Sequence, residues 1–185
     1  PWDNVPEVIV SVGIMPRSNR HYWTMSQKRS SAIGQRKEKK MKLVIQRVKN
    51  AKVDVENETI AKIEKGFLIL VGVTHEDTLK NADYLAKKVC NLRVFEDEND
   101  KMNLSIKDVN GEFLVVSQFT LYADTTGGNR PSFTDSAKPD IAKDLYDYFC
   151  EKCKEYGVKV EKGIFGAHME VSLLNDGPVT IIMEK

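Results

Sequence analysis

The sequence predicts a mixed α/β fold: mostly antiparallel, barrel-like β-sheets with two main helices packed outside. Short apolar runs with strand-like alternation recur along the chain and are separated by turn-forming residues. Only two stretches, residues 78–92 and 139–156, have the apolar spacing of a long amphipathic helix. Strands joined mainly by hairpins, with so few helices, favour a curled sheet with helices on its outside.

Four strands are expected before the first helix. Residues 43–48 and 51–56 alternate as sheet strands do, and the turn signal Asn57-Glu58 makes residues 59–63 a hairpin partner. Residues 67–73 are apolar on both faces, which predicts a central place in the sheet.

A helix should follow, with Asp77 or Thr78 as its cap and its end near Leu92. A short strand at 93–96 and a polar turn at 98–101 come next. The apolar residues of the helix share one face: Leu79, Ala82, Leu85, Ala86, Val89 and Leu92.

The second half is expected to begin with a strand at 113–122 and a loop at 123–131. Pro139 suits the first turn of a helix over 139–156, and Gly157 lies just beyond its end. Three further strands are expected at 158–162, 169–174 and 179–183.

Length and composition fit one globular domain. The chain has 185 residues, of which 41% are hydrophobic and 30% charged, and no apolar run approaches the roughly 20 residues that cross a bilayer, so no membrane partner is expected. Residues 1–40 hold 8 Lys+Arg and 3 Asp+Glu, so the remaining residues hold 28 − 8 = 20 basic and 27 − 3 = 24 acidic ones, a net charge of −4. A body of this charge does not resemble a non-specific nucleic-acid binder, and we expect any nucleic-acid contact to be local.

Residues 1–40 have no sustained hydrophobic period, whereas Met41 opens a clear strand pattern. We therefore expect a disordered or non-native leader over 1–40 and a domain over 41–185. The Arg and Ser content of the leader leaves an organelle-targeting role open.

The cysteines and histidines argue against metal and cofactor chemistry. Cys90, Cys150 and Cys153 are too few and too odd in number for a disulfide framework, which favours a reducing compartment and a cytoplasmic location. Cys150-x-x-Cys153 lacks the two further ligands of a structural zinc site, and three scattered histidines form no Ser-His-Asp pattern. No phosphate-binding glycine motif is present, so we expect neither metal nor cofactor.

Ser117, Gln118 and Thr120 follow an apolar strand-like run and bring polar groups to a sheet edge. The segment either leaves the core and satisfies its own backbone, or it forms a site. In a site, Gln118 or Ser117 would hold an ester carbonyl, and the N–H groups of Phe119 and Thr120 would meet an oxyanion. Thr120 acts as a nucleophile only with a base beside it, and none lies nearby in the sequence.

Three other features have two readings each. Gly177-Pro178 is either a plain turn or, with a cis bond, a stiff main-chain wall that rejects a side chain by steric contact. Phe165, between glycines, either stacks on a base or packs in the core. Arg130, in a polar loop, either reaches a phosphate or pairs with an acid of the body.

Five segments together resemble the D-aminoacyl-tRNA deacylase family, and the resemblance spans about Met41 to Lys185. In one respect the sequence departs from the family: Thr126-Gly127 stands where a Lys pair is common, which predicts a weaker phosphate contact from that loop. The five segments are residues 41–48 (MKLVIQRV), 117–121 (SQFTL), 128–133 (GNRPSF), 165–169 (FGAHM) and 175–180 (NDGPVT).

The resemblance implies a homodimeric hydrolase that cleaves the ester between a D-amino acid, or glycine, and the 3′-terminal adenosine of tRNA, a chiral proofreading step in translation. It implies that Phe165 and Met169 lie near the adenosine and that Gly177-Pro178 enters the partner subunit's pocket to exclude L-amino acids. Arg130 is expected to make a weak RNA contact. The residues implied to line the pocket are Ser117, Gln118, Phe119 and Thr120.

Two mechanisms are compatible with the resemblance: attack by Thr120, or assistance by the ribose 2′-OH with protein N–H groups holding the oxyanion. The absence of a base beside Thr120 in the sequence favours the second. Two other hypotheses stay open, namely a non-catalytic binder of aminoacylated tRNA ends and a general esterase with Thr120 as its nucleophile.

Overall fold

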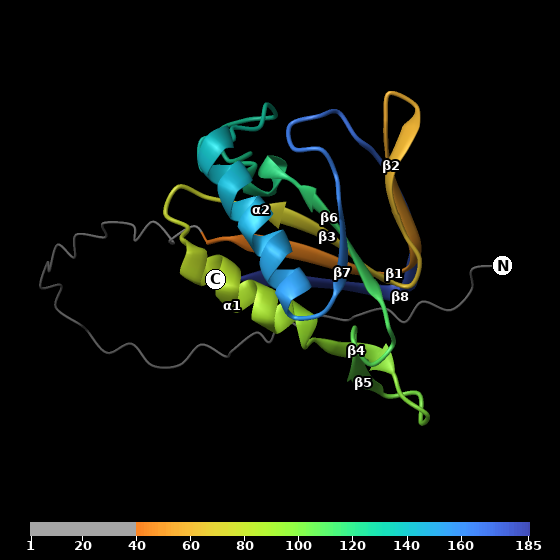
Figure 1. Ribbon diagram of the computed structural model, residues 1–185. Coiled ribbons are helices and arrows are strands. Elements are labelled where there is room, and N and C mark those ends of the chain that lie inside the picture. The colour runs from red at the N-terminus through yellow and green to blue at the C-terminus, as the bar shows by residue number, and fades with distance from the viewer. Residues whose placement is uncertain (1–39) are drawn as a thin grey trace, which may run out of the picture. The chain divides into compact units, whose positions relative to one another are not determined.

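The structure, a computed structural model, describes residues 40–185 (Figure 1). The predicted leader over 1–40 lies outside this range except for Lys40. The elements in chain order are β1 Lys42–Val55, β2 Glu58–Ile63, β3 Gly66–Gly72, α1 Leu79–Cys90, β4 Arg93–Glu96, β5 Met102–Ser105, β6 Glu112–Ser117, the 3₁₀ helix η1 Phe119–Tyr122, α2 Pro139–Glu155, β7 Lys159–Lys162 and β8 Glu170–Glu184.

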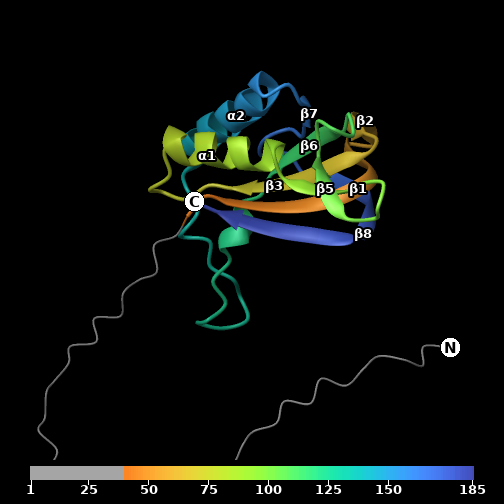
Figure 2. The same ribbon diagram turned by 90° about the horizontal axis from the view of Figure 1, so that it is seen from below.

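The main sheet is built around β1. The first half of β1 pairs with β3 and the second half with β2, while β8 runs along its other edge, all antiparallel. β6 pairs parallel with β3, and β7 pairs parallel with β6. The six-stranded sheet curls into a barrel-like shape, and the β4–β5 hairpin lies beside it (Figures 1 and 2). The predicted fold class is therefore confirmed, with two parallel pairings among the antiparallel ones.

Both faces of the sheet carry an apolar core. On one face, Leu43, Ile69 and Phe113 belong to the cluster that packs against α1 and α2, and these helices lie side by side on that face (Figure 2). On the other face, Leu68 and Leu114 belong to a second cluster. β3 is thus buried on both sides, as its continuous apolar sequence predicts.

The structure shows which of the two residues that the sequence offered, Asp77 or Thr78, caps α1. Thr78 caps α1, and its backbone N–H donates to Asn81 Oδ1 at 2.9 Å. The Asp77 carboxylate instead accepts the backbone N–H groups of Met41 at 2.8 Å and Thr74 at 2.7 Å, which ties the start of β1 to the turn before α1. Pro139 stands in the first turn of α2, as predicted.

All three cysteines are buried and free, at the packed faces of α1 and α2. Cys90 Sγ lies 4.0 Å from the carbonyl oxygen of Cys153. Burial raises the pKa of the Cys150 thiol to about 12.

Within residues 40–185, no helix is both long and apolar enough to span a membrane.

Two predicted strand breaks are wrong because irregularities bend a strand without ending it. The strands predicted at 43–48 and 51–56 correspond to the single strand β1, which ends at Val55 and whose pairing with β8 shifts register twice. The strands predicted at 169–174 and 179–183 correspond to the single strand β8, in which residues 176–179 loop out as a bulge. β5 was not predicted, since Met102–Ser105 has no run of apolar residues.

The strand predicted over 113–122 is also too long. β6 ends at Ser117, and the chain turns into η1. Tyr122 is the reason, because its ring is buried against Gly72 and its hydroxyl donates to the carbonyl of Lys40 at 2.8 Å. A straight strand does not bring this ring back under the sheet.

Asp77 predicts a specific pH dependence of stability. Burial outweighs its two hydrogen bonds and raises the pKa of this carboxyl from 3.8 to about 6. The folded state therefore keeps the proton to a higher pH than the unfolded chain, and the contribution of Asp77 to the free energy of unfolding should fall as pH rises from about 4 to about 6. Urea unfolding of wild type and Asp77→Asn at several pH values measures this. The difference between the two curves should change across this window, and a constant difference would contradict the assignment.

Candidate active site

A cavity of about 700 Å³ opens where β6 ends. Three segments supply most of its walls: residues 116–119 at the end of β6, residues 133–139 before and into α2, and residues 165–169 before β8. Parallel pairing brings the first and third together, because β7 runs beside β6 and continues into the third segment. The Gly163 N–H donates to the carbonyl of Val115 at 3.0 Å and fixes this approach.

Five of the residues predicted for the site line this one cavity. Within a single chain, four predicted residues are not among its lining residues: Thr120, Arg130, Gly177 and Pro178. The five that line it are Ser117, Gln118, Phe119, Phe165 and Met169.

The polar segment after β6 turns sharply at Gln118. The Gln118 N–H donates to the carbonyl of Val71 at 2.8 Å and ends the ladder with β3. The Gln118 side-chain amide then donates to the hydroxyl of the exposed Thr120. An amide NH₂ group cannot accept a proton, so this contact does not activate Thr120 as a nucleophile.

Phe165 both packs and lines the cavity, so its two sequence readings are not exclusive. Its ring lies 6.1 Å from that of Tyr146 on α2. The Tyr146 hydroxyl donates to the carbonyl of Val115 at 2.8 Å, and burial raises the pKa of this phenol far above its ordinary value. Met169 lies over Gly163, where an added Cβ would be 2.6 Å from its sulfur. Both walls are therefore held by contacts behind them.

The sequence assigned no role to three further lining residues: Phe133, Lys138 and His168. Phe133 meets Phe119 edge-on, with ring centroids 5.1 Å apart. Lys138 and His168 add polar groups to a largely apolar wall, and His168 lies next to Met169, which the motif did identify. The position of His168 between Ala167 and Met169 was the available signal. In the described part of the chain, no group of three or more His, Cys, Asp or Glu side chains is arranged to hold a metal ion.

Gly177-Pro178 lies in a bulge of β8 opposite Arg47. Gln46 pairs with Thr180 and Val48 with Asn175, so residues 176–179 loop out of the strand. The Gly177-Pro178 peptide bond is cis, and both residues are exposed.

Close contacts define the shape of the bulge. The Val179 N–H donates to Asn175 Oδ1 at 3.0 Å across it. Gly177 has a φ of +132°, and an added Cβ would lie 2.7 Å from Val179 Cγ2 and 3.3 Å from Arg47 Nη2. The bulge in this shape therefore requires glycine at 177.

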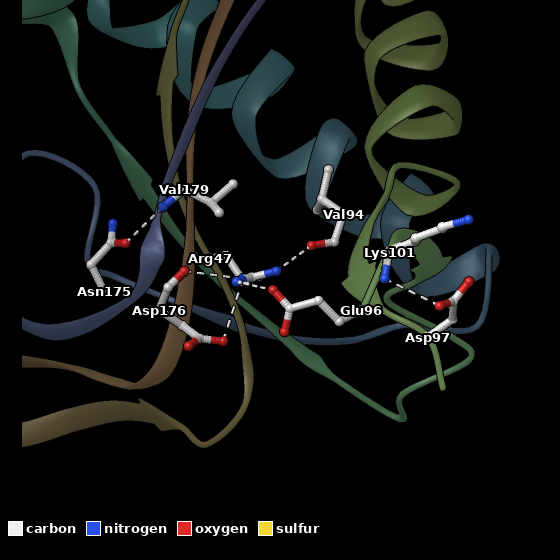
Figure 3. Close-up of polar contacts among 8 residues, drawn as sticks. All are labelled: Arg47, Val94, Glu96, Asp97, Lys101, Asn175, Asp176 and Val179. Atoms are coloured by element: carbon white, nitrogen blue, oxygen red, sulfur yellow. Dashed lines mark hydrogen bonds and ion pairs between the residues drawn. The ribbon is translucent and has the colours of Figure 1, made fainter. Parts of the chain in front are cut away.

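Arg47 holds this bulge from beneath (Figure 3). Its side chain is 3% exposed, and its Nε donates to the carbonyl of Asp176 at 3.0 Å and lies 3.3 Å from Asp176 Oδ2. On its other side, Nη1 donates to the carbonyl of Val94 at 2.5 Å, and Nη2 lies 3.2 Å from Glu96 Oε1. Sequence reasoning missed this role, although an arginine alternating with Leu43 and Ile45 on a buried face must find acceptors.

The family model for D-Tyr-tRNA(Tyr) deacylase matches residues 44–184. The chain belongs to this deacylase family. The D-aminoacyl-tRNA deacylases of Thermosipho africanus and Fusobacterium nucleatum are 60% and 56% identical to it over 144 residues, which cover 78% of this chain and 97% and 95% of theirs. The resemblance seen in the motifs, the hydrolase class and the hydrolysis of D-aminoacyl-tRNA are thereby confirmed.

Two solved structures resemble this deacylase. A c-Myc DNA unwinding element binding protein is 40% identical, with a TM-score of 0.73 over 78% of this chain and 98% of the other. A probable eukaryotic D-amino acid tRNA deacylase has a TM-score of 0.68 over 78% of this chain and 99% of the other, and at 16% identity it supports the fold alone.

The anchor behind Phe165 can be tested in this deacylase. Tyr146→Phe removes one buried hydrogen bond, but the Val115 carbonyl keeps the Gly163 N–H, so the free energy of unfolding should fall by only about 1 kcal/mol. Urea unfolding measures it, with Tyr156→Phe at an exposed position as the matched control, which should change stability by less than about 0.5 kcal/mol. Equal stabilities of the two variants would refute the anchoring role.

Proposed function

We propose that the cavity beside Ser117 binds the aminoacylated 3′-terminal adenosine of tRNA, and that the ester of a D-amino acid or glycine is cleaved there. The observation that carries this proposal is the shared cavity: five residues from two distant motifs line it, in a chain of the deacylase family. The aromatic side chains of Phe119, Phe133 and Phe165 offer flat apolar surface to a base.

We also propose that residues 41–185 form the deacylase domain and act with the translation machinery in the cytoplasm.

The polar end of the cavity suits an ester. The Ser117 hydroxyl and Gln118 amide offer hydrogen bonds to the ester or the ribose. The first N–H groups of a helix have no acceptor within it, so those of Phe119 and Thr120 at the start of η1 are candidates to meet the oxyanion. Such donors act on the charge that develops as water adds to the carbonyl carbon.

The proposed mechanism uses the ribose 2′-hydroxyl and not Thr120. Water attacks the ester carbonyl, the bond to the 3′-oxygen breaks, and the 2′-hydroxyl helps carry the proton from the water to that oxygen. Thr120 accepts a hydrogen bond from Gln118 and does not line the cavity within its own chain, which speaks against its attack on the ester. Arg130 lies in an exposed loop and is proposed only as a weak RNA contact.

A second copy of the chain is proposed to complete the site. Gly177 and Pro178 are exposed and do not line the cavity of their own chain, whereas β8 has hydrogen-bonded neighbours only along β1 among the described strands. Three large apolar side chains are exposed on β8, with Leu173 at 37%, Leu174 at 53% and Ile182 at 63%. A long open strand edge with apolar side chains is a surface that proteins normally cover. In the homodimer, the bulge would reach the partner's cavity and exclude an L side chain by steric overlap.

Chirality is the direct test of the proposed site. An overlap that costs about 3 kcal/mol in the transition state should make D-Tyr-tRNA hydrolysis ~100-fold faster than that of L-Tyr-tRNA. Thr120→Ala should keep most of the D activity. Equal rates on both substrates would overturn the proposal, and a covalent adduct at Thr120 that disappears with the substitution would favour the general esterase. Retention of charged tRNA without loss of the ester would favour the binder.

The dimer can be tested separately. Leu174→Asp and Ile182→Asp place a charge on exposed apolar positions of β8 and should convert a dimer into a monomer in sedimentation experiments, with loss of chiral discrimination. Leu79→Asp is the matched control, because Leu79 is 52% exposed on α1 and should leave the dimer intact. A wild-type protein that is monomeric and fully selective would refute the shared site.

A further inference from the structure

The guanidinium of Arg47 is bound on two sides by separate parts of the chain (Figure 3). The bulge supplies the carbonyl and carboxylate of Asp176, and β4 supplies the carbonyl of Val94 and the carboxylate of Glu96. We propose that Glu96 is a positioning residue that acts through Arg47 on the Asp176-Gly177 segment and so sets the discrimination between D and L substrates. The inference rests on the proposed role of Gly177-Pro178.

The geometry explains how a residue on β4 controls the bulge. A guanidinium is planar and always charged, and its donors point in fixed directions. Val94 and Glu96 bind its two terminal nitrogens at 2.5 and 3.2 Å and thereby set its plane. With the plane set, the Nε–H direction is set as well, and Asp176 is held where that donor points. Without Glu96, the group keeps only the Val94 carbonyl on this side and can turn about it.

β4 is a firm support for this contact. The ring of Phe95 stacks on Phe67 at 5.1 Å, and Phe67 stacks on Phe113 of β6 at 5.6 Å, so β4 is anchored in the main core. The Arg47 guanidinium also lies 6.0 Å from the Phe95 ring. Arg47 and β4 therefore tie the bulge to the main core of its own protomer.

Stability and selectivity should respond differently to loss of Glu96. Its side chain is 52% exposed, and a half-exposed ion pair contributes little to the free energy of unfolding. Exclusion of L substrates by steric overlap is more sensitive to position than the free energy of unfolding is, since a small displacement of the bulge opens room for an L side chain. The expected signature is a gain of L-substrate hydrolysis in a normally folded protein.

The experiment compares kcat/KM for D-Tyr-tRNA and L-Tyr-tRNA in wild type, Glu96→Ala and Glu96→Gln. The ratio of D to L should fall about tenfold in Glu96→Ala, equivalent to ~1.4 kcal/mol, through faster L hydrolysis and with D hydrolysis within about twofold of wild type. Glu96→Gln keeps an acceptor oxygen and should lose less. Glu98→Ala, on the same hairpin and exposed, is the matched control and should keep the wild-type ratio.

Two further variants test whether Glu96 acts through Arg47. If Glu96 acts through Arg47, then Asp176→Asn should also lower the ratio, and the double variant Glu96→Ala/Asp176→Asn should lose less than the product of the single losses. An unchanged ratio in Glu96→Ala, or equal losses on both substrates, would overturn the inference while leaving the proposed function intact. A wild type that does not discriminate would instead overturn the proposed function and this inference with it.

Discussion

The buried charge of Arg47 is the constraint on which the bulge of β8 and its connection to β4 depend. A guanidinium that cannot lose its proton is costly to remove from water unless acceptors surround it. Here those acceptors come from β4 and from the bulge of β8, two segments far apart in the sequence. The Arg47 side chain thus links β1, the β4–β5 hairpin and the bulge of β8, which is the segment proposed to distinguish D from L substrates.

The cavity has the opposite character. Its walls are mostly apolar, and each is supported from behind: Phe165 by Tyr146, Met169 by its contact with Gly163, and the end of β6 by the sheet. Few of the lining side chains are polar, namely Ser117, Gln118, Ser136, Lys138 and His168. This division, in which packing shapes the pocket and a small number of hydrogen bonds orient the ligand, is typical of small-molecule sites.

Local patterns predicted the elements that local physics determines. The helices followed from apolar spacing and caps, and β3 from its continuous apolar run. Ser117 and Gln118, which line the cavity, followed from polar side chains at a strand end. Their meeting with Phe165 depends on the parallel register of β6 and β7, which no local pattern encodes. The continuity of β1 and β8 was missed for a related reason, because a bulge resets the alternation and resembles a strand end in the sequence.

The packing of the helices also determines how reactive the three cysteines are. The chain has three, and all of them lie buried where α1 and α2 meet. Burial favours the neutral thiol of Cys150, whereas oxidation and alkylation proceed through the exposed thiolate. Their reduced state is therefore protected by the interior itself, and it carries no information about the redox potential of the surroundings. A single cysteine introduced on the surface would accordingly react alone, which makes this scaffold ready for site-specific labelling without removal of its native thiols.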